Sequence, residues 1–187
     1  MYTLAHLSDL HIFSSKDSRP VDFLNKRLFG FLKWRLQRHA EHRNAILVQL
    51  LEDLRHKQPD HTVLTGDLVH LSLPDEYRKA DYFVQAMGNP DSVTILPGNH
   101  DAYIRGGLER HINKWSPYMR SDENFRPAGE AHANYQIFPM VRIRNEVALI
   151  GVSSAIPCSP LLAVGEVGNR QQRDLAEILR TAGQQGL

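Results

Sequence analysis

The sequence predicts an α/β fold in which parallel strands alternate with helices. Three short apolar runs, at residues 3–7, 62–65 and 93–96, end in polar or glycine-containing loops and have the length of buried strands. Segments with helical periodicity lie between them. Because a parallel strand pair needs a long crossover, usually a helix, this alternation favours one sheet with helices packed against it.

The two crossover segments each carry one apolar face. In the first, the apolar residues at helical spacing are Ile46, Leu47, Leu50, Leu51 and Leu54. In the second, they are Tyr77, Ala80, Phe83, Val84 and Met87. Pro74, Asp75 and Glu76 precede the second stripe, and a proline followed by acidic residues is typical of a helix N-terminus. Both segments are therefore predicted helices.

The pattern changes after the third strand. A short helix is predicted by three apolar residues, Leu108, Ile112 and Trp115. Residues 136–144 and 147–153 predict two strands joined as a hairpin. A last helix is predicted by Leu175, Ile178, Leu179 and Ala182. We expect this helix to end at Gly183, and residues 1–187 to form a single domain because no linker divides them.

One segment, residues 19–43, departs from this alternation. It is strongly basic, with Arg19, Lys26, Arg27, Lys33, Arg35, Arg38 and Arg43 against the acids Asp22 and Glu41. Its leucines recur every four residues, at Leu24, Leu28, Leu32 and Leu36. The pattern predicts a basic amphipathic helix, residues 22–43, inserted after the first strand. We expect its leucines to pack on the domain; a lid over an anionic substrate and a surface for anionic lipid are the alternatives.

Bulk composition is that of an ordinary globular protein. Of the 187 residues, 42% are hydrophobic and 23% charged, and the formal net charge of +1 gives no strong field to select nucleic acid or membrane. The single cysteine, Cys158, excludes an intrachain disulfide and suits a reducing compartment. No apolar run could span a bilayer, and residues 1–13 lack the features of a secretory signal. We therefore expect a soluble, cytoplasmic protein.

Polar side chains follow all three predicted strands. Asp9 and His11 follow the first, Asp67 follows the second, and Asn99 and His100 follow the third. Since the carboxyl ends of parallel strands meet at one edge of a sheet, we expect these residues to converge there. Alternation along an extended segment is expected to place Asp9 and His11 on the same side. Oxygen and imidazole donors without thiolate suit Mn²⁺, Fe or Zn²⁺.

The residues around these positions resemble a known family. Residues 8–11 (Ser-Asp-Leu-His), 66–70 (Gly-Asp-Leu-Val-His) and 98–101 (Gly-Asn-His-Asp) are similar, in order and spacing, to the first three signature blocks of calcineurin-like metallophosphoesterases. The bacterial branch that includes class III cyclic-nucleotide phosphodiesterases is the more similar one. The resemblance implies a mixed β-sandwich flanked by helices in four layers. It also implies metal-dependent hydrolysis of a phosphoester, a diester rather than a monoester.

The resemblance assigns metal-binding roles residue by residue. Asp9 and His11 would bind one metal, Asp67 would bridge two metals, and Asn99 would bind the second. Two cations held in this way would generate an attacking hydroxide from a shared water. The implied cofactors are therefore two Mn, Fe or Zn ions, and the implied substrate is a small phosphoester.

The histidines fall into different groups. By resemblance, His100 would protonate or stabilise the leaving oxygen, and Asp101 would orient its loop from outside the metal site. His70 is expected either to contact substrate or a metal ligand, or to be an ordinary loop histidine. His6 lies within a strand and is expected to be a core or surface residue whose hydrogen bonds are satisfied. The others are expected at the surface: His39, His42, His56, His61, His111 and His132.

Two further signature blocks of the family, a histidine pair and Gly-His-x-His, have no counterpart in this sequence, which looks C-terminally incomplete. With only Asp67 and Asn99 for the second metal, we expect weak binding of that cation and little or no activity of the isolated chain. One alternative is a non-catalytic metal-binding domain that interacts through its basic helix. The other is a Mn²⁺-dependent nuclease, which is not favoured because a basic patch alone has little specificity for nucleic acid.

Overall fold

The structure, a computed structural model, describes residues 1–14, 16, 18–24, 27–33, 44–123, 137–157, 164–184 and 186. Strands and helices alternate as predicted: β1 (Leu4–Leu7), α2 (Asn44–Lys57), β2 (His61–Leu64), α3 (Pro74–Met87) and β3 (Val93–Ile95). The strands form a parallel, 3-stranded sheet in the order β1-β2-β3. The predicted α/β fold is therefore confirmed.

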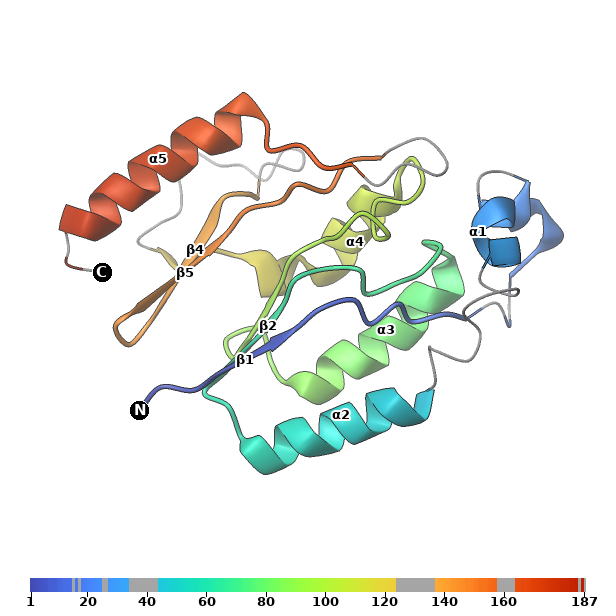
Figure 1. Ribbon diagram of the computed structural model, residues 1–187, viewed down its shortest axis with the longest axis horizontal. Coiled ribbons are helices and arrows are strands. Elements are labelled where there is room, and N and C mark those ends of the chain that lie inside the picture. The colour runs from blue at the N-terminus through green and yellow to red at the C-terminus, as the bar shows by residue number, and fades with distance from the viewer. Residues whose placement is uncertain are drawn as a thin grey trace.

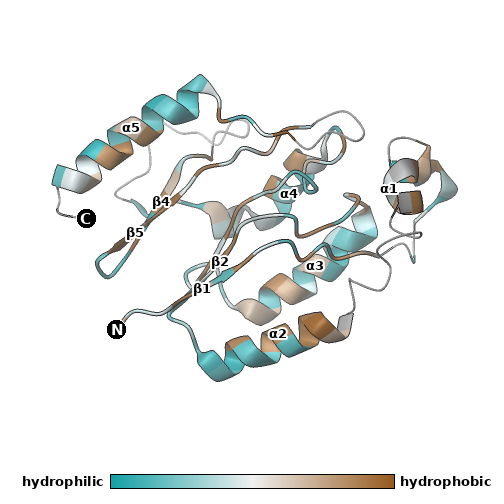
Figure 2. Ribbon diagram, viewed as in Figure 1, coloured by the Kyte–Doolittle hydropathy of each residue, from teal (hydrophilic) through white to brown (hydrophobic). Residues whose placement is uncertain are grey.

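The main core lies between this sheet and its crossover helices. Helices α2 and α3 lie on one side of the parallel strands, and the remaining β-structure lies on the other (Figure 1). Hydrophobic and hydrophilic residues alternate along both helices, as expected for helices with one buried face (Figure 2). The buried residues of the predicted α3 stripe are Tyr77, Ala80, Phe83 and Val84. They belong to one apolar cluster with Leu64 of β2 and Ile95 of β3, which fixes the helix against the sheet.

The predicted hairpin is present as strands β4 (Met140–Arg144) and β5 (Val147–Gly151), which pair antiparallel. Asn145, in the turn between them, has a φ of 53°, a left-handed conformation that asparagine tolerates. The hairpin is tied to the parallel sheet by Arg142, whose buried guanidinium donates hydrogen bonds to the carbonyls of Pro90 (2.7 Å) and Val93 (2.8 Å). Because Val93 begins β3 and Pro90 lies shortly before it, this contact fixes the position of the hairpin on the sheet.

Two helices follow β3 and β5. Helix α4 (Gly107–Trp115) continues into the 3₁₀ turn η3 (Ser116–Met119), and α5 (Asn169–Gln184) is the last helix described. The prediction that the last helix ends at Gly183 was wrong, since α5 includes that residue. A Cβ there would meet nothing within 4 Å, and glycine costs an exposed helix only about 1 kcal/mol relative to alanine. No helix in the described part of the chain is long and apolar enough to cross a membrane.

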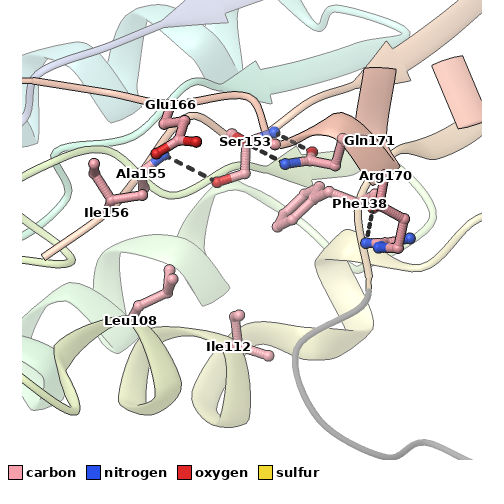
Figure 3. Close-up of a pocket in the computed structure, with 10 residues that line it drawn as sticks. Leu108, Ile112, Phe138, Ser153, Ala155, Ile156, Glu166, Arg170 and Gln171 are labelled. Atoms are coloured by element: carbon pink, nitrogen blue, oxygen red, sulfur yellow. Dashed lines mark hydrogen bonds between the residues drawn. The ribbon is translucent and has the colours of Figure 1, made fainter. Parts of the chain in front are cut away.

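Helix α5 is attached to the segment that follows β5. The Ser153 amide donates to Oε1 of Gln171 (3.1 Å), and Nε2 of Gln171 donates back to the Ser153 carbonyl (2.8 Å), as Figure 3 shows. Arg170 reaches the carbonyl of Phe138 (2.6 Å). A cavity of about 250 Å³ lies between this segment and α4, with Leu108 and Ile112 on its apolar wall (Figure 3).

The basic segment differs from its prediction. The structure describes two short helices, η1 (Pro20–Phe23) and α1 (Arg27–Lys33), rather than one continuous helix, and residues 34–43 lie outside the described residues. The three leucines that the structure describes do not form the expected buried face: Leu24, Leu28 and Leu32 are 80%, 44% and 46% exposed. Arg27, in contrast, is buried. Burial is therefore partly the reverse of the prediction, with a basic residue buried and leucines exposed. The buried guanidinium is tolerated because it finds backbone acceptors for its hydrogen bonds.

His61 was predicted at the surface, but it is buried in β2 and its Nε2 lies 2.8 Å from Oγ1 of Thr94. Burial, together with Arg144 and Arg142, lowers its pKa from 6.5 to about 4. Below about pH 6.5 this histidine takes up a proton in the unfolded state but stays neutral in the folded state. The free energy of unfolding is therefore unaffected by His61 above about pH 6.5 and decreases as the pH falls towards 4.

We therefore expect His61→Gln to lose less stability than the wild type between pH 6.5 and pH 4. Glutamine keeps a nitrogen donor for Thr94 but cannot titrate. Urea unfolding across this pH range measures the difference in the free energy of unfolding. The exposed His56, replaced in the same way, provides the control. If the free energy of unfolding decreased equally in the wild type and in His61→Gln, the prediction would be contradicted.

Candidate metal centre

The loops that follow β1, β2 and β3 meet at the carboxyl edge of the parallel sheet. The first two loops are joined by backbone hydrogen bonds, from the Asp9 amide to the Gly66 carbonyl (3.2 Å) and from the His11 amide to the Asp67 carbonyl (2.8 Å). The third loop approaches them closely, since a Cβ on Gly66 would lie 2.6 Å from Cα of Gly98. Gly66 also has a φ of 97°, which favours glycine. The loops can therefore lie close together only because glycine occupies these positions.

Asp9, His11 and Asp67 form one cluster, as predicted. Nε2 of His11 lies 3.5 Å from Oδ1 of Asp9 and 3.9 Å from Oδ2 of Asp67. One ligand atom from each residue lies within 4.8 Å of the other two, a separation from which they could hold one metal ion. His11 is buried, Asp67 is partly buried and Asp9 is exposed, so the cluster opens to solvent at Asp9.

The predicted convergence is present, but the extended alternation expected of Asp9 and His11 is not. Strand β1 ends at Leu7, so Asp9 and His11 do not alternate along an extended segment. Asp9, His11 and Asp67 instead have φ values of 59°, 44° and 53°. A left-handed conformation costs a residue other than glycine roughly 1–3 kcal/mol, and such strain is concentrated at functional sites. The surrounding fold therefore holds three residues with strained backbone conformations close together.

Asn99 lies at the same edge as Asp9 and Asp67. All three residues line a cavity of about 400 Å³, whose other wall includes Ser154 and Gly165. The cavity therefore combines carboxylate and amide oxygens with space for a small molecule.

His100 lies directly beside this cluster. Its amide donates to Oδ1 of Asp67 (2.8 Å), and its ring centroid lies 4.5 Å from that of His11. Nδ1 of His100 lies 2.6 Å from the carbonyl oxygen of His70. Because a carbonyl can only accept, Nδ1 carries the hydrogen, and Nε2 is the nitrogen left for chemistry. The ring is stacked between those of His70 (5.2 Å) and Tyr103 (5.6 Å), so its orientation is fixed on both faces.

His70 lies beside His11 and His100. It is buried, and its ring lies 5.5 Å from that of His11 and 5.2 Å from that of His100, measured between centroids. Asp101 is fully buried and accepts a hydrogen bond from the Gly98 amide (2.8 Å), so it contacts the third loop from behind. Both residues thus lie where they can orient groups that line the site.

The electrostatics of the cluster suit a cation. Burial raises the pKa of Asp67, and the nearby carboxylates of Asp101 and Asp9 act in the same direction, while His100 opposes them. A bound cation would stabilise the charged form of such a carboxylate. The donor set of carboxylate, amide and imidazole groups therefore fits a divalent cation of the transition series.

The sequence analysis missed the contribution of four residues near the site. The carbonyl of Ser72 accepts hydrogen bonds from Arg27 and from Arg110 (2.9 Å), and its hydroxyl donates to the His100 carbonyl (2.8 Å). Arg27 also donates from Nε to the Leu71 carbonyl (2.9 Å), which anchors α1 beside the site. His111, predicted at the surface, is fully buried behind Asp101. No local motif identified these residues; their partners are distant in sequence.

A parallel sheet whose strand ends gather oxygen and imidazole donors defines a metal-binding α/β protein. The profile of the calcineurin-like phosphoesterase family matches residues 2–157, and the chain belongs to this family. A relative, the glycerophosphodiester phosphodiesterase GpdQ of Enterobacter lignolyticus (strain SCF1), is 31% identical over 136 residues. The matched segment covers 72% of this chain and 42% of that relative. The chain therefore matches less than half of the relative's length.

Gly98→Ala is expected to weaken Mn²⁺ binding by at least about tenfold, the lower end of the effect of disturbing groups that orient metal ligands. A Cβ at this position would lie 2.5 Å from the Asp67 amide nitrogen and 2.9 Å from Cγ of Asp67, so this carboxylate must move. Isothermal titration with Mn²⁺ measures the loss. Gly183→Ala, where a Cβ meets nothing within 4 Å, is the control. Unchanged Mn²⁺ affinity in Gly98→Ala would show that Asp67 does not bind the cation.

Proposed function

We propose that the protein hydrolyses a phosphodiester with the help of two cations held at the carboxyl edge of its sheet. The observation that carries this proposal is the convergence of Asp9, His11 and Asp67 beside His100, in a chain of the calcineurin-like phosphoesterase family. Because the matched segment covers 42% of the relative's length, the activity proposed is that of the whole protein.

In this proposal each residue of the cluster has its own task. Asp9, His11 and Asp67 would hold the first cation, and Asp67 with Asn99 would hold the second. Such cations, when bound, lower the pKa of water and neutralise charge on the phosphoryl oxygens. His100 would hold a proton on Nε2 and deliver it to the leaving oxygen, because its Nδ1 hydrogen already bonds the His70 carbonyl. Stacking by Tyr103 keeps the ring in the orientation that this transfer requires.

The cations proposed are Mn²⁺, Fe or Zn²⁺, which accept mixed oxygen and imidazole donors. The first site has donors from three residues and the second from two, Asp67 and Asn99, so we propose that the second cation binds more weakly. A titration with Mn²⁺ should then show two steps.

The reducing environment suggested by a single cysteine supports a cytoplasmic location.

The preference for a diester rests on resemblance and on the GpdQ relative, which is a glycerophosphodiester phosphodiesterase. The test is to remove metal from the purified protein with a chelator and add back Mn²⁺, Fe²⁺ or Zn²⁺. We expect cation-dependent hydrolysis of bis(p-nitrophenyl) phosphate, with a higher kcat/KM than for p-nitrophenyl phosphate. A reversed preference would replace the diester by a monoester.

The same assay separates the alternatives. Cleavage of single-stranded DNA in Mn²⁺, without hydrolysis of small diesters or cyclic nucleotides, would identify a nuclease. Tight Mn²⁺ binding without hydrolysis of any phosphoester would identify a non-catalytic metal-binding domain and overturn the proposed function.

We also propose that α1 contacts anionic lipid. The supporting observation is the exposure of Leu24, Leu28 and Leu32 within a segment rich in lysine and arginine. An apolar face beside cations suits the surface of an anionic bilayer. We expect Leu24→Ser with Leu28→Ser to reduce sedimentation with phosphatidylglycerol vesicles, while the exposed Leu179→Ser on α5 does not. Equal sedimentation of all three proteins would contradict this contact.

A further inference from the structure

A buried pair of a histidine and a carboxylate lies behind the proposed metal centre. Nδ1 of His111, in α4, lies 3.5 Å from Oδ1 of Asp101, and both side chains are 0% exposed. The His111 ring meets the edge of Trp115 at 4.8 Å between centroids. Among the described residues, neither ring nitrogen of His111 makes a hydrogen bond of good geometry, so Asp101 is the polar group that it faces.

Asp101 connects two of the loops that build the site. Its Oδ2 accepts a hydrogen bond from the Gly98 amide (2.8 Å), immediately before Asn99 and His100. Its Oδ1 accepts one from the Val69 amide (3.2 Å), immediately before His70. One carboxylate therefore joins the loop after β3 to the loop after β2. His111 approaches the same oxygen, Oδ1, that accepts from Val69.

Few polar groups hold this carboxylate: the amides of Gly98 and Val69, and His111 on the side of Oδ1. The backbone of Asp101 is also fixed, because the Tyr77 hydroxyl donates to its carbonyl (3.1 Å). A buried carboxylate that loses one of its few polar partners must change its hydrogen bonds or move.

We propose that His111 is a positioning residue of the phosphoesterase site, which acts through Asp101 to hold the His70 and Asn99–His100 loops in register. It touches neither cation nor substrate. The proposal rests on the proposed function and deepens it, since it extends the site to a helix that none of the family blocks includes. At metal sites, residues behind the ligands fix the orientation of the groups that bind and react, and His111 would have this role here.

Two substitutions at the same position separate positioning from packing. Asparagine places its amide nitrogen where Nδ1 of histidine lies and can donate to Asp101, whereas leucine has a similar branch but no donor. We expect His111→Leu to weaken Mn²⁺ binding, lower kcat, or both, by about 10–100-fold, with little change in KM. We expect His111→Asn to recover most of this loss. Ile112→Ala, at the next buried residue of α4, removes packing without a polar group and is the control.

The measurements are Mn²⁺ affinity by electron paramagnetic resonance, kcat and KM on the diester, and the melting temperature. If His111 only packs, kcat and Mn²⁺ affinity per folded molecule stay at the wild-type values in His111→Leu, and the proposal is overturned. Equal losses in His111→Asn and His111→Leu would also overturn it. If the wild type binds Mn²⁺ but hydrolyses nothing, the proposed function fails, while the Mn²⁺ affinities of the variants still test the positioning role.

Discussion

Asp67→Asn is expected to lower kcat/KM for cation-dependent hydrolysis by about 10³-fold or more, because one substitution removes charge from both proposed cation sites. Asparagine has almost the shape of aspartate and keeps an oxygen to accept the His100 amide, a bond of 2.8 Å in the native protein. The loop after β3 should therefore stay in place. What changes is the charge available to a cation beside Asp9 and His11.

The fold of Asp67→Asn should be at least as stable as that of the wild type without metal. Burial raises the pKa of Asp67, which means that the charged carboxylate is disfavoured where it lies. Removal of that charge relieves this cost. We thus expect a loss of Mn²⁺ affinity in titration calorimetry together with an unchanged or raised melting temperature in chelator.

Asp91→Asn is the matched control, since Asp91 is exposed and lies before β3, at the end of the strand away from the site. It changes net charge equally and should leave both Mn²⁺ affinity and hydrolysis intact. An Asp67→Asn protein that binds Mn²⁺ as the wild type does would remove Asp67 from the metal centre. It would then leave Asp9 and His11 as an incomplete pair of donors.

The sequence predicts much of the fold and the location of the site because both depend on local signals. Residues 62–65 and 93–96 are short and apolar, and the structure has β2 and β3 there within one residue at each end. Donors placed directly after such strands must converge once the strands are parallel, whatever the detailed backbone path. That is why Asp9 and His11 lie together even though the extended geometry expected of them is absent.

The residues that support the site could not be predicted in the same way. His61 and His111 have no motif around them, and their partners are Thr94, on the neighbouring strand, and Asp101, in the loop after it. Arg27 reads as one more cation of a basic helix, but its hydrogen bonds run to carbonyls 44 and 45 residues away. Burial of a polar side chain is decided by such distant acceptors, and no periodicity reports them. Because α1 is anchored through Arg27, its leucines Leu28 and Leu32 do not form the buried face.

His100→Asn is expected to lower kcat by about 10²–10⁴-fold for a phosphodiester with an alkyl leaving group and much less for one with a p-nitrophenyl leaving group. A poor leaving group needs a proton as the bond to phosphorus breaks, whereas nitrophenolate leaves without one. In the native site Nδ1 of His100 donates to the His70 carbonyl over 2.6 Å. The asparagine amide can keep that bond, so the variant removes only Nε2, the group proposed to carry the proton.

The comparison of leaving groups separates two roles that a single substrate would merge. If His100 protonates the leaving oxygen, the ratio of wild-type to variant kcat rises steeply with the pKa of the leaving alcohol. If His100 instead stabilises charge on the phosphoryl oxygens, both substrates lose equally, and the proposed proton transfer is wrong. Mn²⁺ binding at the cluster of Asp9, His11 and Asp67 should be unchanged in either case, because His100 is not one of its three donors. A loss of Mn²⁺ affinity would instead place the cation in the second group that could hold a metal ion, His11, His70 and His100. His56→Asn, at an exposed histidine of α2, should leave both substrates unaffected, so any selective loss belongs to the ring fixed between His70 and Tyr103.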